Sequence, residues 1–187
     1  MTRPAQRPNE VRLIGGQWKR SKLPVADRPG LRPTPDRVRE TLYNWLGQDL
    51  TGWRVLDAFA GSGALGFEAA SRGAASVLLL ERDPMLAASL RASQARLKAQ
   101  TLRVEQSDAI GWMARCAPAS FELVLLDPPF DSNLLAPALA LAAPLLVDGG
   151  FVYVEAAAAL ADWPAPLQAW RQGRAGQVHF QLLRRDG

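Results

Sequence analysis

The chain has 187 residues, of which 48% are hydrophobic and 21% charged, with a net charge of +4. This length and composition favour one main folded domain that needs no disulfide or metal for its stability. Its single cysteine and single histidine disfavour an internal disulfide, a zinc cluster and a catalytic Ser-His or Cys-His pair. The longest apolar stretch, residues 134–147, is too short to span a bilayer. We therefore expect a cytoplasmic protein with no metal and no membrane partner.

Positive charge is concentrated at the start of the chain. Residues 1–40 contain ten Lys/Arg and four Asp/Glu, a net +6, whereas residues 41–187 contain twelve against fourteen, a net −2. Because lysine and arginine release counterions when they contact phosphates, this basic segment is predicted to bind a nucleic acid. A solvated tail that binds nothing is the alternative.

Residues 11–23 predict a short basic β-hairpin, with strands over residues 11–14 and 17–23 and a turn at Gly15 and Gly16. A hairpin of this size is marginal alone, so it should rest on the main body or become ordered on a partner. The candidate nucleic-acid-binding side chains of the hairpin and the segment after it are Arg12, Lys19, Arg20, Lys22 and Arg32.

A helix is predicted over residues 36–47. Thr34 would be its N-cap, Pro35 its first helical residue, and Asp36 would lie in the first turn, near the positive end of the helix dipole. The apolar residues of this helix fall on one face, at Val38, Leu42, Trp45 and Leu46. We define residues 1–48 as a basic N-terminal extension and residues 49–187 as a separate α/β domain.

From residue 53 the sequence alternates between strands and helices, which is typical of a parallel sheet covered on both faces. Strands are predicted near residues 53–58, 76–81, 101–105, 121–126 and 150–155, and helices near residues 64–72, 83–98, 109–116 and 132–146. Gly149 and Gly150 are predicted to end the last of these helices. Residues 167–172 and 177–183 are joined by a glycine-containing turn, so the sheet should end in an antiparallel hairpin.

Residues 55–66 predict a strand, a glycine-rich turn and the start of a helix. Gly61, Gly63 and Gly66 match the pattern G-x-G-x-x-G, which lets backbone approach a ligand but is shared with dinucleotide-binding enzymes. Asp57, four residues before the first of these glycines, would attract a cationic ligand and repel a pyrophosphate. The same turn contributes Phe59 and Ser62 as candidate ligand-binding residues.

Three further carboxylates follow the predicted strands. Glu81 ends the second strand, where it could bind both hydroxyls of a ribose, with Arg82 next to it. Asp83 is predicted to be the N-cap of the following helix. Asp108 could accept a hydrogen bond from an adenine amino group, with Ala109 against the ring, or it could be a helix N-cap, and both roles can coexist.

Asp127-Pro128-Pro129-Phe130 follows the apolar run of residues 121–126, at the end of a predicted buried strand. The carboxylate of Asp127 and the carbonyl of Pro128 could accept the two protons of an exocyclic amine, while Phe130 stacks on its ring. We call these four residues the amine clamp. A strand-ending acid followed by a proline stop is the alternative reading of the motif.

The chain resembles bacterial 16S ribosomal RNA guanine-N2 methyltransferases of the RsmD family. The matching stretches are residues 12–19, 22–25, 30–46, 56–73 and 127–130. The resemblance implies a Rossmann-like methyltransferase fold with a seven-stranded sheet, S-adenosylmethionine as the cofactor, and methylation of a guanine in 16S rRNA within small-subunit assembly intermediates. We expect a monomer.

Site roles also follow from this resemblance. The cofactor would be bound by Asp57, Phe59, Gly61, Ser62, Gly63, Glu81, Arg82, Asp108, Ala109, Thr34 and Arg37, and the guanine by the amine clamp as catalytic residues. Three alternatives stay open: an adenine-N6 methyltransferase acting on DNA or RNA, a dinucleotide-dependent oxidoreductase, and a ribosome-assembly factor without catalytic activity.

Overall fold

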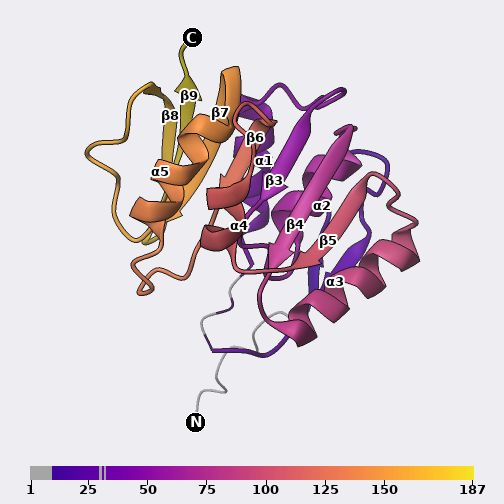
Figure 1. Cartoon of the computed structure of the whole chain (residues 1–187). Coiled ribbons are helices and arrows are strands. Elements are labelled where there is room, and N and C mark those ends of the chain that lie inside the picture. Colours follow the sequence, from indigo (N-terminus) through magenta and orange to yellow (C-terminus); the bar gives the residue numbers. More distant parts are fainter. Residues whose placement is uncertain (1–9, 30, 32) are drawn as a thin grey trace.

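The computed structural model describes residues 10–29, 31 and 33–187, and a seven-stranded sheet forms its centre (Figure 1). The strands of this sheet are β3 (Arg54–Asp57), β4 (Ser76–Glu81), β5 (Leu102–Gln106), β6 (Phe121–Leu126), β7 (Leu146–Ala156), β8 (Leu167–Ala175) and β9 (Val178–Arg185). The helices are α1 (Asp36–Trp45), α2 (Ala64–Ser71), α3 (Pro84–Leu97), α4 (Ala109–Arg115) and α5 (Leu135–Leu145).

The sheet has the strand order β5-β4-β3-β6-β7-β9-β8. Neighbouring strands from β5 to β7 are parallel, whereas β9 runs antiparallel to both β7 and β8. The predicted mostly parallel sheet with a terminal antiparallel hairpin is therefore confirmed. In the view of Figure 1, α4 and α5 lie in front of the sheet and α1 and α2 behind it.

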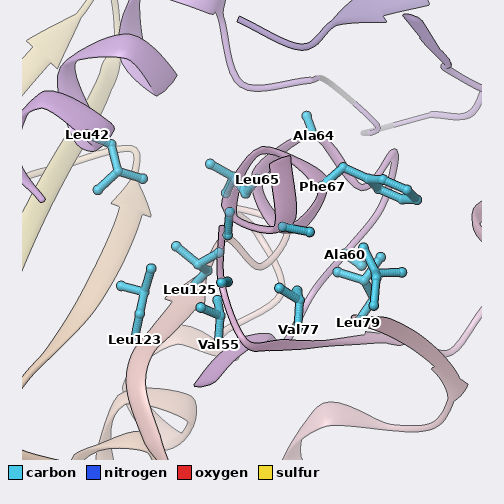
Figure 2. Close-up of a cluster of buried hydrophobic side chains, with 14 of the residues drawn as sticks. Leu42, Val55, Ala60, Ala64, Leu65, Phe67, Val77, Leu79, Leu123 and Leu125 are labelled. Atoms are coloured by element: carbon cyan, nitrogen blue, oxygen red, sulfur yellow. The ribbon is translucent and has the colours of Figure 1, made fainter. Parts of the chain in front are cut away.

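Two apolar clusters fill the two sides of the sheet. One joins the sheet to α1, α2 and α3, and the other joins it to α4 and α5. Figure 2 shows part of the first cluster, in which Val55, Val77 and Leu79 of the sheet lie beneath Leu65 and Phe67 of α2. Within the described ranges, no helix has the length and apolar character needed to cross a membrane.

Helix α2 lies close against the sheet because Gly66 has no side chain. A Cβ at this position would come within 2.1 Å of Leu79 Cδ2 and 3.0 Å of Asp57 Oδ2. All eight residues of α2 are buried. Gly66, the last glycine of the G-x-G-x-x-G pattern, is thus required for packing of the helix on β3 and β4.

Two predicted boundaries on the α5 side are wrong. Strand β7 begins at Leu146 and not near residue 150, so Gly149 and Gly150 lie within the strand rather than at the end of a helix. The pairing of β6 with β7 shifts register between Phe121 and Leu123, and Gly149 has a φ of 77°, which accommodates the extra residues of β7. Helix α5 begins at residue 135 rather than 132.

The predicted N-terminal hairpin exists, but its turn is longer than expected. Strands β1 (Glu10–Arg12) and β2 (Lys22–Pro24) pair antiparallel, so residues 13–21 form the connection. The backbone N–H groups of Ile14 and Gly15 donate to Glu68 of α2, at 3.0 Å and 2.8 Å from its nearest oxygens. These contacts with α2 prevent a tight turn at Gly15 and Gly16.

A buried ion network joins the N-terminal extension to the α/β domain. Arg39 of α1 and Glu68 of α2 are both fully buried, with 3.0 Å between Arg39 Nη1 and Glu68 Oε2. The same guanidinium donates to the backbone carbonyls of Arg12 and Thr34. Arg72 donates to the other oxygen of Glu68 at 3.1 Å. The extension is therefore bound to the domain through two paired charges as well as apolar contacts.

Helix α1 begins at Asp36, as predicted, but Thr34 is not its N-cap. Pro35 occupies the cap position with a φ of −55° and a ψ of 150°, and no side chain caps the helix. The Thr34 hydroxyl donates instead to Glu155 at the end of β7, at 2.8 Å. The capping rule fails here because a buried carboxylate accepts the hydroxyl hydrogen bond in the folded protein.

We expect Arg39→Met to lower the free energy of unfolding by about 3–5 kcal/mol, because it leaves the carboxylate of Glu68 buried without its main cation. Chemical denaturation followed by circular dichroism would measure this loss. Arg91→Met, at an exposed position of α3, is the matched control and should change stability by less than about 0.5 kcal/mol. An equal effect of the two variants would contradict a structural role for the buried pair.

Candidate active site

The amine clamp lies at the carboxyl end of β6, in the middle of the sheet. Residues 123–126 of this strand are fully buried, and the chain leaves the sheet at Asp127, which is half-buried. Pro128 is buried and Phe130 is 50% exposed. Phe130 is therefore not a core residue, and its ring is accessible for stacking.

Four carboxylates extend from the ends of four neighbouring strands on one face of the sheet. The residue two positions before each carboxylate belongs to the apolar cluster on the α1, α2 and α3 side of the sheet. These four residues are Leu79, Val55, Leu125 and Tyr153. Because side chains alternate along a strand, the acids two positions later face the same side. We call this set the acid row, and it consists of Glu81 of β4, Asp57 of β3, Asp127 after β6 and Glu155 of β7.

Glu155 is the most densely bonded member of the acid row. Its Oε1 atom accepts hydrogen bonds from the Thr34 hydroxyl at 2.8 Å and from the Tyr153 hydroxyl at 2.7 Å. The Asp127 carboxyl also lies within hydrogen-bond reach of the Glu155 carboxyl. Asp127 is thus connected through Glu155 to Thr34 of the N-terminal extension.

These contacts change the acidity of both carboxyl groups. Burial raises the pKa of Asp127 well above that of an ordinary aspartate, and the negative charges of Glu155 and Asp57 raise it further. Burial also raises the pKa of Glu155, although the hydrogen bonds from Tyr153, Thr34 and Asp127 oppose this rise. The pair therefore tends to retain a proton.

Asp57 is buried beneath the glycine-rich turn. Its Oδ2 atom accepts from the backbone N–H of Gly66 at 3.0 Å, whereas its Oδ1 atom is buried without a hydrogen-bond partner. Burial raises the pKa of Asp57 to about 7, and the charges of Glu81 and Glu155 contribute to this rise. A buried acceptor without a donor is a place where a cationic or hydrogen-bonding ligand would be stabilised.

Glu81 accepts a hydrogen bond from the backbone of the glycine-rich turn. Its carboxylate accepts from the backbone N–H of Gly61 at 2.9 Å and from that of Asp83 at 3.0 Å. Gly61 and Gly63 have φ values of 55° and 84°, which favour glycine at both positions. The structure thus gives Glu81 a role in shaping the turn, and its predicted binding of a ribose stays a prediction.

Two acids predicted near the cofactor are helix N-caps. Asp83 accepts from the backbone N–H groups of Met85 and Leu86 at the start of α3, as predicted. Asp108 accepts from the backbone N–H of Gly111 at 2.8 Å and caps α4, the alternative that the sequence left open. Both N-caps lie at the carboxyl end of the sheet, where the resemblance places the cofactor.

The other predicted cofactor-binding residues occupy different environments. Phe59 and Ser62 are half-buried in the glycine-rich turn, Ala109 is buried at the start of α4, and Arg82 is exposed after β4. Thr34 is buried against Glu155, whereas Arg37 is exposed on α1. No interaction with a cofactor is tested for any of these residues, so their assignment stays a prediction.

The predicted RNA-binding residues lie on the surface of the N-terminal extension. Lys19 and Arg20 are exposed in the connection between β1 and β2. Arg12 forms an ion pair with Asp36 at 3.3 Å, and Lys22 forms one with Glu10 at 3.2 Å, but both basic side chains remain more than half exposed. Arg32 lies outside the described residues.

A cavity of about 450 Å³ opens on the α5 side of the amine clamp. It lies between the clamp, the start of α5 and the connection from β7 to β8, and its wall includes Pro128, Phe130, Leu134, Leu160 and Trp163. Phe130 therefore lines this largely apolar cavity while half of its surface stays exposed. The cavity is large enough to hold a planar aromatic ring.

Sequence reasoning missed Glu155 and Tyr153, and it gave Thr34 roles as a helix cap and a cofactor-binding residue but no contact with Glu155. The available signal was weak: Glu155 ends a predicted strand next to the strand that precedes the amine clamp, with Tyr153 on the same face by alternation. Thr34 carried no such signal, since it lies 121 residues away from Glu155 in the chain. Arg39 and Glu68 were missed for the same reason.

Comparison with known proteins agrees with the family resemblance that the sequence shows. A family model described as "Conserved hypothetical protein 95" matches residues 11–184. Ribosomal RNA small subunit methyltransferase D of Escherichia coli is 44% identical over 95% of this chain and 91% of its own length. The protein of the same name from Haemophilus influenzae is 44% identical over 73% of this chain and 74% of its own length.

Solved structures agree with the sequence comparison. The Escherichia coli protein yhhF superimposes with a TM-score of 0.85 at 43% identity, covering 95% of this chain and 99% of that one. A solved protein from Haemophilus influenzae gives 0.80 at 33% identity, with coverage of 95% and 99%. The fold and strand-end motifs define a Rossmann-like methyltransferase. Within this class, the chain belongs to the RsmD family.

The raised pKa of Asp57 makes a prediction about stability. Because the folded-state pKa of about 7 lies above that of an unfolded aspartate, Asp57 favours folding below pH 4 and loses this contribution as the pH rises through 7. Between pH 5 and pH 8 the loss should amount to about 2–3 kcal/mol. We therefore compare the free energy of unfolding of Asp57→Asn with that of the unchanged protein at each pH. We expect this difference to favour the variant more at pH 8 than at pH 5.

Urea denaturation without cofactor at the two pH values measures this difference. Asp108→Asn is the matched control, since Asp108 is exposed, and its effect should be similar at both pH values. An Asp57→Asn effect that is independent of pH would refute the proposed acidity of Asp57.

Proposed function

We propose that the protein transfers a methyl group from S-adenosylmethionine to the exocyclic N2 of a guanine in 16S ribosomal RNA. The observation that carries the proposal is the amine clamp at the carboxyl end of β6, where Asp127 belongs to the acid row and Phe130 is 50% exposed. Membership in the RsmD family and the names of the relatives from Escherichia coli and Haemophilus influenzae support the rRNA substrate.

The residues at the strand ends fit a cationic nucleoside cofactor. Asp57 Oδ1 is a buried acceptor without a donor, and Glu81 and Glu155 add negative charge on the same face. Gly61 is partly exposed in the turn above Asp57, so its backbone could contact a ligand there. When bound, S-adenosylmethionine would supply an electrophilic methyl group on a sulfonium, whose positive charge these carboxylates would stabilise.

The amine clamp would orient the guanine amino group. The carboxylate of Asp127 and the carbonyl oxygen of Pro128 would each accept one N–H of the amine, and Phe130 would stack on the base. Both hydrogen bonds direct the nitrogen lone pair away from the protein acceptors. Alignment of the nitrogen with the methyl group could contribute about 7–11 kcal/mol to the lowering of the barrier.

Asp127 would also complete the proton balance of the reaction. As the new N–CH₃ bond forms and the S–CH₃ bond breaks, the nitrogen becomes positively charged. The hydrogen bond to Asp127 stabilises this charge, and the carboxylate then takes one proton from the nitrogen. No separate base is needed, because the amine loses its proton after it has become a strong acid.

RNA would be bound mainly through the N-terminal extension. Lys19 and Arg20 are exposed there, whereas the strand ends carry the acid row, which repels phosphates. We propose that the substrate is a guanine within a small-subunit assembly intermediate, since a base must leave its stack to reach the amine clamp. Immature particles would present the target base without the contacts of the finished subunit.

The central experiment measures methyl transfer from labelled S-adenosylmethionine to small-subunit particles from cells that lack this gene. Mature particles and DNA are the controls, and the labelled nucleoside is identified. N2-methylguanosine formed on immature particles would support the proposal. Label in N6-methyladenine would overturn the guanine substrate, and no label anywhere despite cofactor binding would favour an assembly factor without catalysis.

Asp127→Ala should lower the turnover rate about 10²–10³-fold, because one preorganised electrostatic partner of the reacting nitrogen is lost. The affinity for S-adenosylmethionine should change little. Single-turnover methyl transfer and isothermal titration calorimetry measure the two quantities. Asp131→Ala is the matched control, since Asp131 is an exposed acid four residues further along the chain. An equal loss of cofactor affinity in Asp127→Ala would argue against this catalytic role.

Replacing Lys19, Arg20 and Lys22 together by glutamine should reduce the salt dependence of RNA binding. The slope of log affinity against log salt should fall by about three units if each side chain contacts one phosphate. Filter binding at several salt concentrations measures it. A control with three other exposed basic residues replaced, Arg91 on α3, Lys98 directly after α3 and Arg103 on β5, should keep the original slope. An unchanged slope in the first variant would identify the extension as a solvated tail.

A further inference from the structure

Glu155 is a buried acid that the catalytic scheme does not use. It is 4% exposed, and its Oε1 atom accepts hydrogen bonds from Thr34 and Tyr153 at 2.8 Å and 2.7 Å. Its carboxyl group lies within hydrogen-bond reach of Asp127. The parallel register of β6 and β7 explains this contact, since Leu126 pairs with Val154 and the two acids are the next residues on each strand.

Two carboxyl groups can hydrogen-bond to each other only if one of them carries a proton. Glu155 accepts from the hydroxyls of both Thr34 and Tyr153, whereas Asp127 has only Thr34 as a hydroxyl donor. The ionised form of Glu155 is therefore the better stabilised of the two, and a shared proton is more stable on Asp127. Asp127 in this form is a neutral acid. It is therefore a weaker acceptor for an amine than the carboxylate that the reaction requires.

The surroundings of the pair favour retention of this proton. Burial and the charge of Asp57 raise the pKa of Asp127 in the same direction as Glu155 does. Four other ionisable side chains interact with the pair or with its partners. They are Asp57 of β3, Glu81 of β4, Tyr153 of β7 and Tyr43 of α1. All four are acids or phenols, so a cation placed among them would favour loss of the proton.

We propose that Glu155 is a positioning residue that keeps a proton on Asp127 in the cofactor-free protein, and that this proton is released to solvent when the cationic cofactor binds beside the acid row. The inference rests on the proposed function and extends it. Asp127 becomes a full acceptor for the amine only after the methyl donor is in place. Capture of the base is thus coupled to the presence of the donor.

The test counts the protons released when S-adenosylmethionine binds. Isothermal titration calorimetry at pH 7 in two buffers of different ionisation enthalpy gives this number directly. We expect the unchanged protein to release about one proton more per cofactor than Glu155→Gln, because the amide of the variant can donate to an Asp127 that is already ionised. The release that remains in Glu155→Gln comes from Asp57, whose pKa is about 7. S-adenosylhomocysteine, which lacks the sulfonium charge, should release fewer protons from the unchanged protein.

Two further variants locate the proton. Asp57→Asn should keep the part of the proton release that depends on Glu155. Asp127→Asn should lose this part, as Glu155→Gln does. If Glu155→Gln fails to fold, as judged by circular dichroism, Asp127→Asn still tests the pair. Equal proton release from the unchanged protein and from the folded variants of both acids would overturn the inference, as would a release that is lost only in Asp57→Asn.

Failure of this inference can be distinguished from failure of the proposed function. Cofactor binding with methyl transfer, but without a release that depends on Glu155, would overturn the inference alone. Absence of S-adenosylmethionine binding to the unchanged protein would overturn the proposed cofactor and the inference together.

Discussion

The buried ion pair between Arg39 and Glu68 determines where the N-terminal extension lies. Both side chains are fully buried, so their removal from water must be offset by close hydrogen bonds. Glu68 accepts from two backbone N–H groups of the extension and from two arginines, and Arg39 donates to the carbonyl of Thr34. The position of Thr34, and with it the hydroxyl that contacts Glu155, therefore depends on a pair of charges on α1 and α2.

The acid row is a consequence of parallel strand geometry. Strands that run in one direction end at one edge of the sheet, and alternation places every second side chain on one face. On that face, the apolar cluster contains Leu79, Leu125 and Tyr153. The acids two positions later follow them at the carboxyl ends of the strands and make that edge negatively charged. Such a concentration of carboxylates costs stability without a counter-charge, which is consistent with the raised pKa values of Asp57 and Asp127.

Local patterns in the sequence were sufficient for the sheet but not for the contacts between distant segments. The apolar run of β6 and the amine clamp after it are adjacent in the chain, so both could be located from the sequence. Thr34 was misassigned as a helix cap because its partner Glu155 is 121 residues away, and no local rule identifies that partner. The start of β7 was missed because glycines usually end helices, whereas here Gly149 accommodates a register shift.

In the proposed function, the two ligands carry opposite charges and meet different parts of the protein. The phosphates of RNA would contact the basic extension, whose net charge over residues 1–40 is +6, while the cationic donor would lie at the acid row. A whole nucleotide strand cannot approach carboxylates closely, but a single uncharged base can. The acid row would then exclude phosphates from the reaction centre, and a base extruded from its stack would bring only its amine to Asp127.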